Sequence, residues 1–292
     1  MVGIAQVTLN ELNSRFENTN ELDKKFPFRL IDPYYIEEAF LLLGFQNVEV
    51  RLLILPETRV YRDFSINYYG GYSTMTEGMG RSSFPEWTKI RNLNFQPNTV
   101  FRLNDENIWF LRNYPKSRKQ LKSDDPITLS IIKYFRAIKT KNLNDAILDS
   151  VIGLETLLAN RYTGISFQFR TNLALLIGQS YSDRVLIDKL GRILYFLRSN
   201  IVHGGGVGNE FEANISKLGP RNKVKNIFLF TLQIVLFRFL KIDDNHMSFY
   251  SRDSIIEELE KARLGESMEI QSNSYYQRFY KDFLNSLENL DL

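Results

Sequence analysis

The chain has 292 residues, of which 43% are hydrophobic and 24% charged, and its formal net charge is +3. A chain of this length and balance can bury a large core, and two domains are the natural expectation. It has no cysteine and two histidines, which excludes disulfides, thiolate metal sites, a cysteine nucleophile and a histidine-rich metal site.

The first 125 residues are predicted to form a mixed α/β domain. Asp32 is a cap, Pro33 a first helical residue and Gly44 a stop, so a helix is predicted between them. The composition of the following segments predicts two strands, a loop, and then a strand or short helix, in this order: 48–55, 58–66, 67–84 and 107–115.

Helical periodicity dominates after Asp125 and Pro126, which together predict a helix start. In one later helix we expect Ser182 to be the cap and Gly204 the stop. The fold class is therefore α+β, with a mixed domain at 1–125 and an antiparallel helical bundle at 126–292. Its further helices are predicted at 143–161, 166–178, 182–204, 220–241 and 251–265.

The longest apolar stretch, 227–240, is too short for a membrane span and carries Gln233 and Arg238. It predicts a buried helix and no membrane partner. Residues 1–16 lack a basic start followed by an apolar run, so we expect no signal peptide and a cytoplasmic location.

Positive charge is concentrated in the middle of the chain. Residues 1–125 have a net charge of 0, residues 126–242 of +9, and residues 243–292, an acidic extension, of −6. A local positive field attracts polyanions, of which nucleic acid is the commonest, although a solvated basic face with no partner is an equal alternative.

The stretch LRSNIVHGGGVG, residues 197–208, places Arg198 and His203 at the end of a predicted helix. Arginine offers a fixed charge and a planar fork of donors suited to phosphate. The negative end of the helix dipole favours a charged imidazole at His203. An acid–base group and a cation are what RNA phosphodiester cleavage requires, and Ser199 and Asn200 could add hydrogen bonds.

In an ideal helix Arg198 and His203 lie about 140° apart around the axis, so both face one site only if the helix ends or loosens at His203. The glycine run that follows permits this. The alternative is a helix-terminal histidine that satisfies main-chain carbonyls, and an arginine on the surface of the bundle.

RSNIVHG resembles the R-x4-H motif of the HEPN superfamily. The segments AILDSVIGLETLL, FRTNLALLIG and LGRILYFLRSNIVHG resemble, in order and spacing, the Apea-like HEPN subgroup. The resemblance covers roughly residues 126–245. It implies a helical bundle that dimerises, and often a metal-independent endoribonuclease without cofactors in which Arg198 and His203 of both protomers act. Many such proteins act in antiviral defence or in RNA processing.

Two positions differ from patterns common in the superfamily. Gly205 stands where toxins paired with nucleotidyltransferases carry a tyrosine, which argues against silencing by nucleotidylation there. Ser199 follows the arginine, where many active nucleases place Asn, Asp or His. This favours an alternative function, a non-catalytic HEPN module that binds RNA, a nucleotide or a protein partner.

Further candidates have two interpretations each. Glu155 either orients Arg198 or a neighbour, or reaches solvent. His246 is predicted to lie in a surface loop. Four basic residues could contact the backbone of a single-stranded RNA or could equally be solvated: Arg192, Arg221, Lys223 and Lys225. Three tyrosines could stack on bases or could equally pack in a loop: Tyr68, Tyr69 and Tyr72.

The mechanism predicts a homodimer. One histidine cannot easily serve as both base and acid on opposite sides of an in-line displacement, whereas a two-fold axis supplies two His203 and two Arg198 to one cleft. Apolar burial must offset the repulsion between two basic segments. The predicted sources of that burial are Ile193, Phe196 and Leu197.

Overall fold

The computed structural model describes residues 33–44, 105–159, 164–204, 208–243, 246–268, 270, 272–287 and 290. By its internal contacts the chain divides into two units, Met1–Lys116 and Ser117–Leu292. The division falls inside helix α5 (Asp105–Gln120), whereas the sequence placed the boundary at 125/126.

In the first unit the structure describes α3 (Pro33–Leu42) and the beginning of α5. The predicted helix and its stop are confirmed, because α3 begins at Pro33 and Gly44 has a φ of 84°. Residues 107–115 are helical, so the strand alternative there was wrong. The other predicted strands, the loop and its tyrosines lie outside the described residues: 48–55, 58–66, 67–84; Tyr68, Tyr69, Tyr72.

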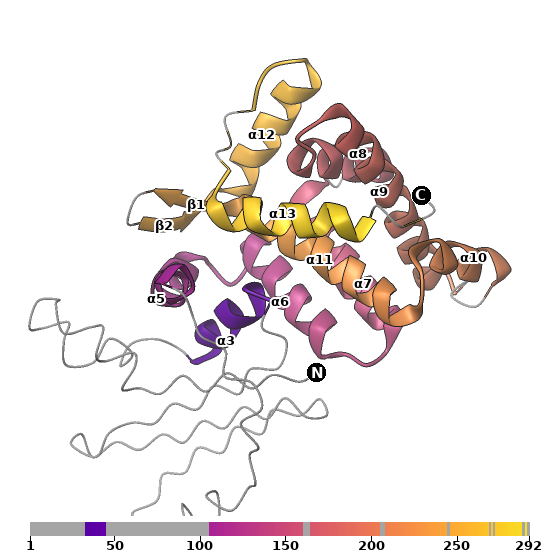
Figure 1. Cartoon of the computed structure of the whole chain (residues 1–292), viewed down its shortest axis with the longest axis horizontal. Helices are drawn as coiled ribbons and strands as arrows, with labels where there is room; N and C mark the ends of the chain where they lie inside the picture. The colour runs from indigo at the N-terminus through magenta and orange to yellow at the C-terminus, as the bar shows by residue number, and fades with distance from the viewer. Residues whose placement is uncertain are drawn as a thin grey trace, which may run out of the picture. The chain divides into compact units, whose positions relative to one another are not determined.

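The second unit is mostly helical in its described part, which confirms the helical bundle in its coarse form (Figure 1). Among its described residues a hairpin interrupts the helices, in which β1 (Leu240–Asp243) pairs antiparallel with β2 (His246–Phe249). The helices of this unit are α6 (Pro126–Lys139), α7 (Leu143–Leu158), α8 (Ile165–Ile177), α9 (Tyr181–Val202), α10 (Asn209–Leu218), α11 (Arg221–Phe239), α12 (Arg252–Arg263) and α13 (Ser274–Leu287).

The start of α6 follows directly from its sequence. The Asp125 carboxylate accepts a hydrogen bond from the main-chain N–H of Ile127 at 2.8 Å, and Pro126 occupies the first helical position. A proline costs nothing there, because the N–H that it lacks has no partner inside the helix. The predicted helix start is confirmed.

The cap of helix α9 lies two residues earlier than predicted. Its cap is Ser180, not Ser182: the Ser180 hydroxyl accepts from the Asp183 N–H at 3.1 Å, and the Asp183 carboxylate accepts from the Ser180 N–H at 3.0 Å. This reciprocal capping box satisfies two main-chain donors together, which Ser182 could not do. The Tyr280 hydroxyl of α13 also donates to the Asp183 carboxylate, at 2.5 Å.

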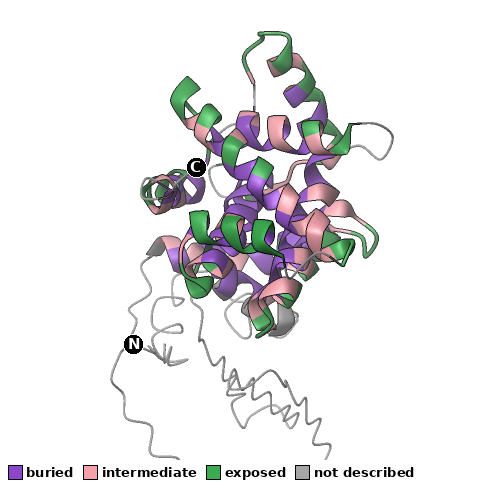
Figure 2. Ribbon diagram, turned by 90° about the vertical axis from the view of Figure 1, so that its right-hand side faces the viewer, coloured by how far each residue is buried: buried purple, intermediate pink, exposed green. Residues whose placement is uncertain are grey.

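Helix α11 is the centre of the bundle, which confirms the predicted buried helix. Every residue from Thr231 to Phe239 is buried, and the helix packs against α6, α7, α8, α10 and α13. Buried residues gather in the middle of the bundle, with exposed ones around them (Figure 2). Its Phe237 ring stacks on Phe279 of α13 at a centroid distance of 4.9 Å. Among the described residues, none of the helices combines the length and the apolar character that crossing a bilayer would require.

Three elements were missing from the sequence prediction: α10, the β1–β2 hairpin and α13. His246 lies in β2 rather than in a loop, although it is exposed as predicted. Helix α10 buries Phe211, Ile215 and Leu218 at helical spacing. The bundle is therefore larger at its C-terminal side than the sequence analysis indicated.

Lys225 has a structural role that leads to a stability prediction. Its Nζ donates to the main-chain oxygens of Ile138 at 3.0 Å and Thr140 at 2.6 Å, at the end of α6. Lys225→Ala removes both bonds, so we expect the free energy of unfolding measured in urea to fall by about 1.5–3 kcal/mol. Lys223→Ala, two residues away on α11, is the control and is expected to stay within about 0.5 kcal/mol of the wild type. Equal stabilities of the two variants would contradict the capping role.

Candidate functional site

The candidate site is built where α7 packs against α9. The Arg198 guanidinium on α9 donates to the Glu155 carboxylate on α7, with Nη2 and Oε2 at 3.1 Å. The two side chains are 25% and 14% exposed, so the ion pair is mostly withdrawn from water. Of the two interpretations of Glu155, the structure therefore has the one in which it orients Arg198.

Burial and Arg198 have opposite effects on the pKa of Glu155. Burial raises the pKa of Glu155 above its ordinary value, and the charge and hydrogen bond of Arg198 pull it back only in part. Glu155 Oε1 and Arg198 Nε are both buried with no hydrogen-bond partner among the described residues. The guanidinium has further donors, so its contact with Glu155 fixes its position without using up its capacity to bind an anion.

His203 is exposed and caps the C-terminal end of α9. Its main-chain N–H donates to the Ser199 oxygen at 3.1 Å, which is the bond of a continuing helix, and the chain turns only at Gly204, where φ is 78°. The helix therefore does not loosen before His203. By helical geometry the two side chains of one chain leave α9 about 140° apart, so within one bundle they face different sides.

Ser199 and Asn200 lie between them and are half-buried. The Asn200 side-chain amide donates to the Phe196 oxygen at 3.0 Å, so this donor is engaged within α9. In this arrangement Asn200 can offer a ligand its amide oxygen rather than this N–H.

A groove runs along α9 from Arg184 to Phe196, and by helical spacing His203 lies beyond its end on the same side of the helix. It lies between α8, α9 and α10, has a volume of about 860 Å³, and is called the α8–α10 groove below. Arg192, one of the predicted RNA-contacting residues, lines it. The rest of its lining is Thr171, Ala174, Leu175, Arg184, Val185, Asp188, Lys189, Ile193, Phe196, Glu210, Asn214 and Lys217.

The other predicted RNA contacts do not gather around this groove. Arg221 is exposed and forms an ion pair with Glu212 at 2.8 Å. Lys223 is half-buried, and Lys225 caps α6 as described above. None of the three lines the α8–α10 groove.

The residues predicted to form the dimer contact are less available than expected. Leu197 is fully buried in the core of its own bundle and Ile193 is only 8% exposed, so the prediction for these two was wrong. Phe196 is half-buried in the α8–α10 groove. Val202, six residues further along α9, is 51% exposed and is the apolar side chain nearest to His203 in sequence.

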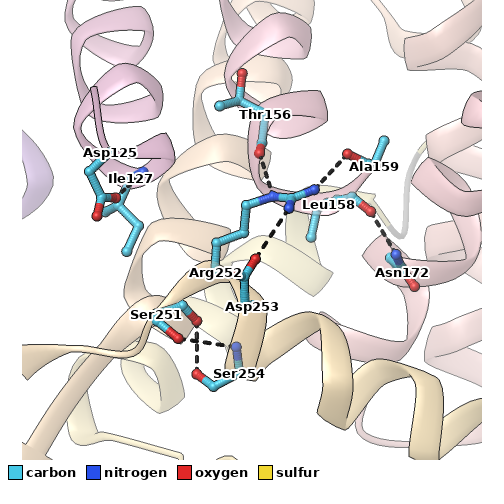
Figure 3. A network of polar contacts seen from close by, with 10 residues as sticks. All are labelled: Asp125, Ile127, Thr156, Leu158, Ala159, Asn172, Ser251, Arg252, Asp253 and Ser254. Carbon is cyan, nitrogen blue, oxygen red and sulfur yellow. Dashed lines mark hydrogen bonds and ion pairs between the residues drawn. The ribbon is translucent and has the colours of Figure 1, made fainter. Parts of the chain in front are cut away.

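A network that the sequence did not predict holds the C-terminal end of α7, the helix that carries Glu155 (Figure 3). Arg252, at the start of α12, donates from Nε to the Thr156 oxygen at 2.9 Å and from Nη2 to the Ala159 oxygen at 2.7 Å. The Asn172 amide of α8 donates to the Leu158 oxygen at 2.6 Å. Arg252 therefore caps the C-terminal end of α7, the helix that carries Glu155.

Arg252→Lys is expected to destabilise the protein by about 1.5–3 kcal/mol, because a lysine cannot donate to two separate carbonyls with the geometry of a guanidinium. Urea unfolding measures the effect. Asp253→Ala is the control: its side chain is 95% exposed and its carboxylate lies 3.6 Å from Arg252 Nη1. We expect it to change stability by less than about 0.5 kcal/mol. A lysine variant as stable as the wild type would contradict the network.

In the described part of the chain, no cluster of three or more His, Asp or Glu side chains is placed to hold a metal ion. Comparison of the sequence with protein-family models and with curated proteins, and of the structure with solved structures, found no match. The interpretation of the site therefore depends on the residues and contacts described above.

Proposed function

We propose that the helical unit is a HEPN-type, metal-independent endoribonuclease that acts on single-stranded RNA as a homodimer in the cytoplasm, in defence or in RNA processing. The observation that carries the proposal is the contrast between its two candidate catalytic residues. Arg198 is held by Glu155 at 3.1 Å, whereas His203 is exposed at the end of the same helix. A fixed cation and an accessible imidazole are the two groups that the reaction needs.

The proposed reaction balances within one composite cleft of two protomers. One His203 removes the proton of a 2′-hydroxyl, whose oxygen attacks the adjacent phosphorus. The P–O5′ bond breaks, and the second His203 delivers a proton to the leaving 5′-oxygen. Arg198 of each protomer stabilises the negative charge of the phosphorane. The products are a 2′,3′-cyclic phosphate and a 5′-hydroxyl.

Two chains are required because one imidazole cannot act as base and acid on opposite sides of the phosphorus in one displacement. The side chains of Arg198 and His203 leave α9 about 140° apart, so a cleft that receives both must lie across the end of the helix. A two-fold axis near the end of α9 would bring the His203 side chains of the two protomers together across the axis. Val202, 51% exposed, supplies apolar area there.

The test is incubation of the purified full-length protein with 5′-labelled single-stranded RNA, with and without EDTA. We expect equal cleavage in both, and fragments that end in a 2′,3′-cyclic phosphate, which acid converts to a 2′- or 3′-phosphate. Intact RNA at every metal condition, together with a His203→Ala variant that behaves as the wild type in cells, would contradict the proposal. Sedimentation at micromolar concentration tests the dimer, and a monomer would contradict the shared site.

A second candidate function is a non-catalytic RNA-binding module. The engagement of the Asn200 amide with the Phe196 oxygen favours it, since that donor would otherwise be available near the motif. The position after the arginine is a serine, Ser199. RNA that binds with strong salt dependence but stays intact would favour this function, because phosphate contacts release condensed counterions.

A further inference from the structure

We propose that the α8–α10 groove binds the single-stranded segment of the nucleic acid that lies to one side of the cleaved bond. The inference deepens the proposed function and rests on it for the position of the cleaved bond. The binding itself does not depend on catalysis.

The rim of the groove has the charge that a phosphate backbone requires. Four cationic side chains line it, three from α9 and one from α10, against two carboxylates, Asp188 and Glu210. One carboxylate, Asp188, is offset by Arg170, whose Nε lies 3.4 Å from it. The cationic residues are Arg184, Lys189, Arg192 and Lys217.

Two of these cations project from opposite walls. Arg192 lies on α9 and Lys217 on α10, and both side chains are exposed. Helices α9 and α10 pack against each other (Figure 1), and both residues line the groove beside this contact. Arg184 is less available, because its Nε donates to the Gly178 oxygen at 3.1 Å.

The groove also offers an aromatic surface. Phe196 lines it and is half-buried, between the basic residues and the end of α9. A nucleobase can stack on such a ring only if it has left its own stack, as in a single strand. Cations that bind phosphates and an aromatic ring that stacks a base together favour single-stranded nucleic acid over a duplex or a small anion.

The groove and His203 lie along one stripe of α9. Arg192, Phe196, Ser199 and His203 follow one another at intervals of three and four residues, which keeps them within about 60° of one another around the helix. By the helical rise, Phe196 is about 10 Å and Arg192 about 16 Å from His203 along the axis. A strand bound in the groove therefore leads towards His203.

The experiment uses a fluorescent single-stranded DNA 20-mer of mixed sequence and the full-length protein. DNA lacks the 2′-hydroxyl that the proposed cleavage needs, so binding is read without turnover. We expect Phe196→Leu, which keeps apolar bulk but removes the ring, to weaken binding about 5-fold or more. The double variant Arg192→Ala with Lys217→Ala is expected to lower the slope of log K against log salt by about 1.4.

The matched control is Arg278→Ala with Lys281→Ala, an exposed arginine and lysine on α13, outside the groove. It removes the same charges and is expected to leave the slope unchanged. Thermal unfolding of all variants identifies any that fail to fold. If Phe196→Leu is unstable, the double variant on the exposed rim still decides the question.

Unchanged affinity and salt slope in both groove variants would overturn the inference. So would an effect of these variants on sedimentation but not on binding, because the groove would then cover a second copy of the chain. RNA cleavage by the wild type separates the two proposals. If the groove variants cleave RNA as the wild type does, the groove proposal is wrong and the nuclease proposal stands. If binding depends on the groove but the wild type does not cleave RNA, the groove binds nucleic acid and the nuclease proposal is wrong.

Discussion

Replacement of His203 by alanine is expected to lower the rate of RNA cleavage by about 10²- to 10⁴-fold, the range that a positioned acid–base group contributes. Both His203 side chains of the composite cleft are lost at once, so the effect should lie towards the upper end. The side chain is exposed at the end of α9 and its main-chain bond to Ser199 persists, so we expect no change in thermal stability.

The chain supplies its own control for this prediction. His246, the second of its two histidines, is also exposed but lies on β2. His246→Ala removes an equivalent imidazole and is expected to cleave RNA at the wild-type rate. Equal losses in the two variants, or no loss in either, would contradict the role of His203.

Arg198→Ala is expected to lower both activity and stability. Loss of the cation should reduce cleavage by about 10²- to 10³-fold, as for the removal of a group that stabilises developing negative charge. Loss of the ion pair leaves Glu155 mostly buried and unpaired, at a cost of about 1–3 kcal/mol. This is less than for a fully buried pair, because the two side chains keep 25% and 14% exposure.

A double variant separates the two effects. Glu155→Leu with Arg198→Met replaces the ion pair by apolar side chains of similar volume, and we expect its stability to return to within about 1 kcal/mol of the wild type. Its cleavage rate should remain as low as that of Arg198→Ala. Recovery of both properties would show that Arg198 supports only the packing of α7 on α9.

The pH dependence of stability gives an independent measure of the same pair. Burial raises the pKa of Glu155 above its unfolded value of 4.5, so its contribution to stability is full below pH 4.5 and is lost as the pH rises through the raised pKa. Arg198→Ala removes the opposing charge and raises this pKa further. The cost of that substitution in urea unfolding should therefore grow as the pH rises from 4.5, and a cost independent of pH would contradict the assignment.

Local signals carried most of the helix prediction. Asp125 before Pro126, and Gly178 and Gly204 after apolar faces, mark helix ends that the structure confirms. The correct cap of α9 was also within reach, because Ser180 stands three residues before Asp183 and completes a capping box, whereas Ser182 does not.

The elements that the sequence did not predict differ in the strength of their sequence patterns. Helix α10 has Phe211, Ile215 and Leu218 at intervals of four and three, and this periodicity could have predicted it. The strands of the hairpin have four residues each, too few for alternation to be distinguished from chance. They exist because the chain reverses after α11 and pairs Leu240 with Phe249.

The geometry of the site could not be read from the sequence because its contacts are distant along the chain. Glu155 and Arg198 are 43 residues apart, and only the packing of α7 on α9 decides that the carboxylate meets this cation. Lys225 bonds to Thr140 across 85 residues, which reassigns a basic residue from a possible RNA contact to a helix cap. Charge and spacing identify candidates, but tertiary packing assigns their partners.

The stacking of α13 on α11 has a consequence for the order in which the bundle is completed during translation. Phe237 packs on Phe279, and Tyr280 reaches back to Asp183 at the start of α9, 97 residues earlier. At roughly 5–20 residues per second, the ribosome finishes α13 about 4 to 17 seconds after α9. Through that interval one aromatic face of α11 is uncovered and the capping box of α9 lacks its tyrosine. The nascent chain therefore exposes an apolar surface for seconds. During this interval we expect it to need a chaperone.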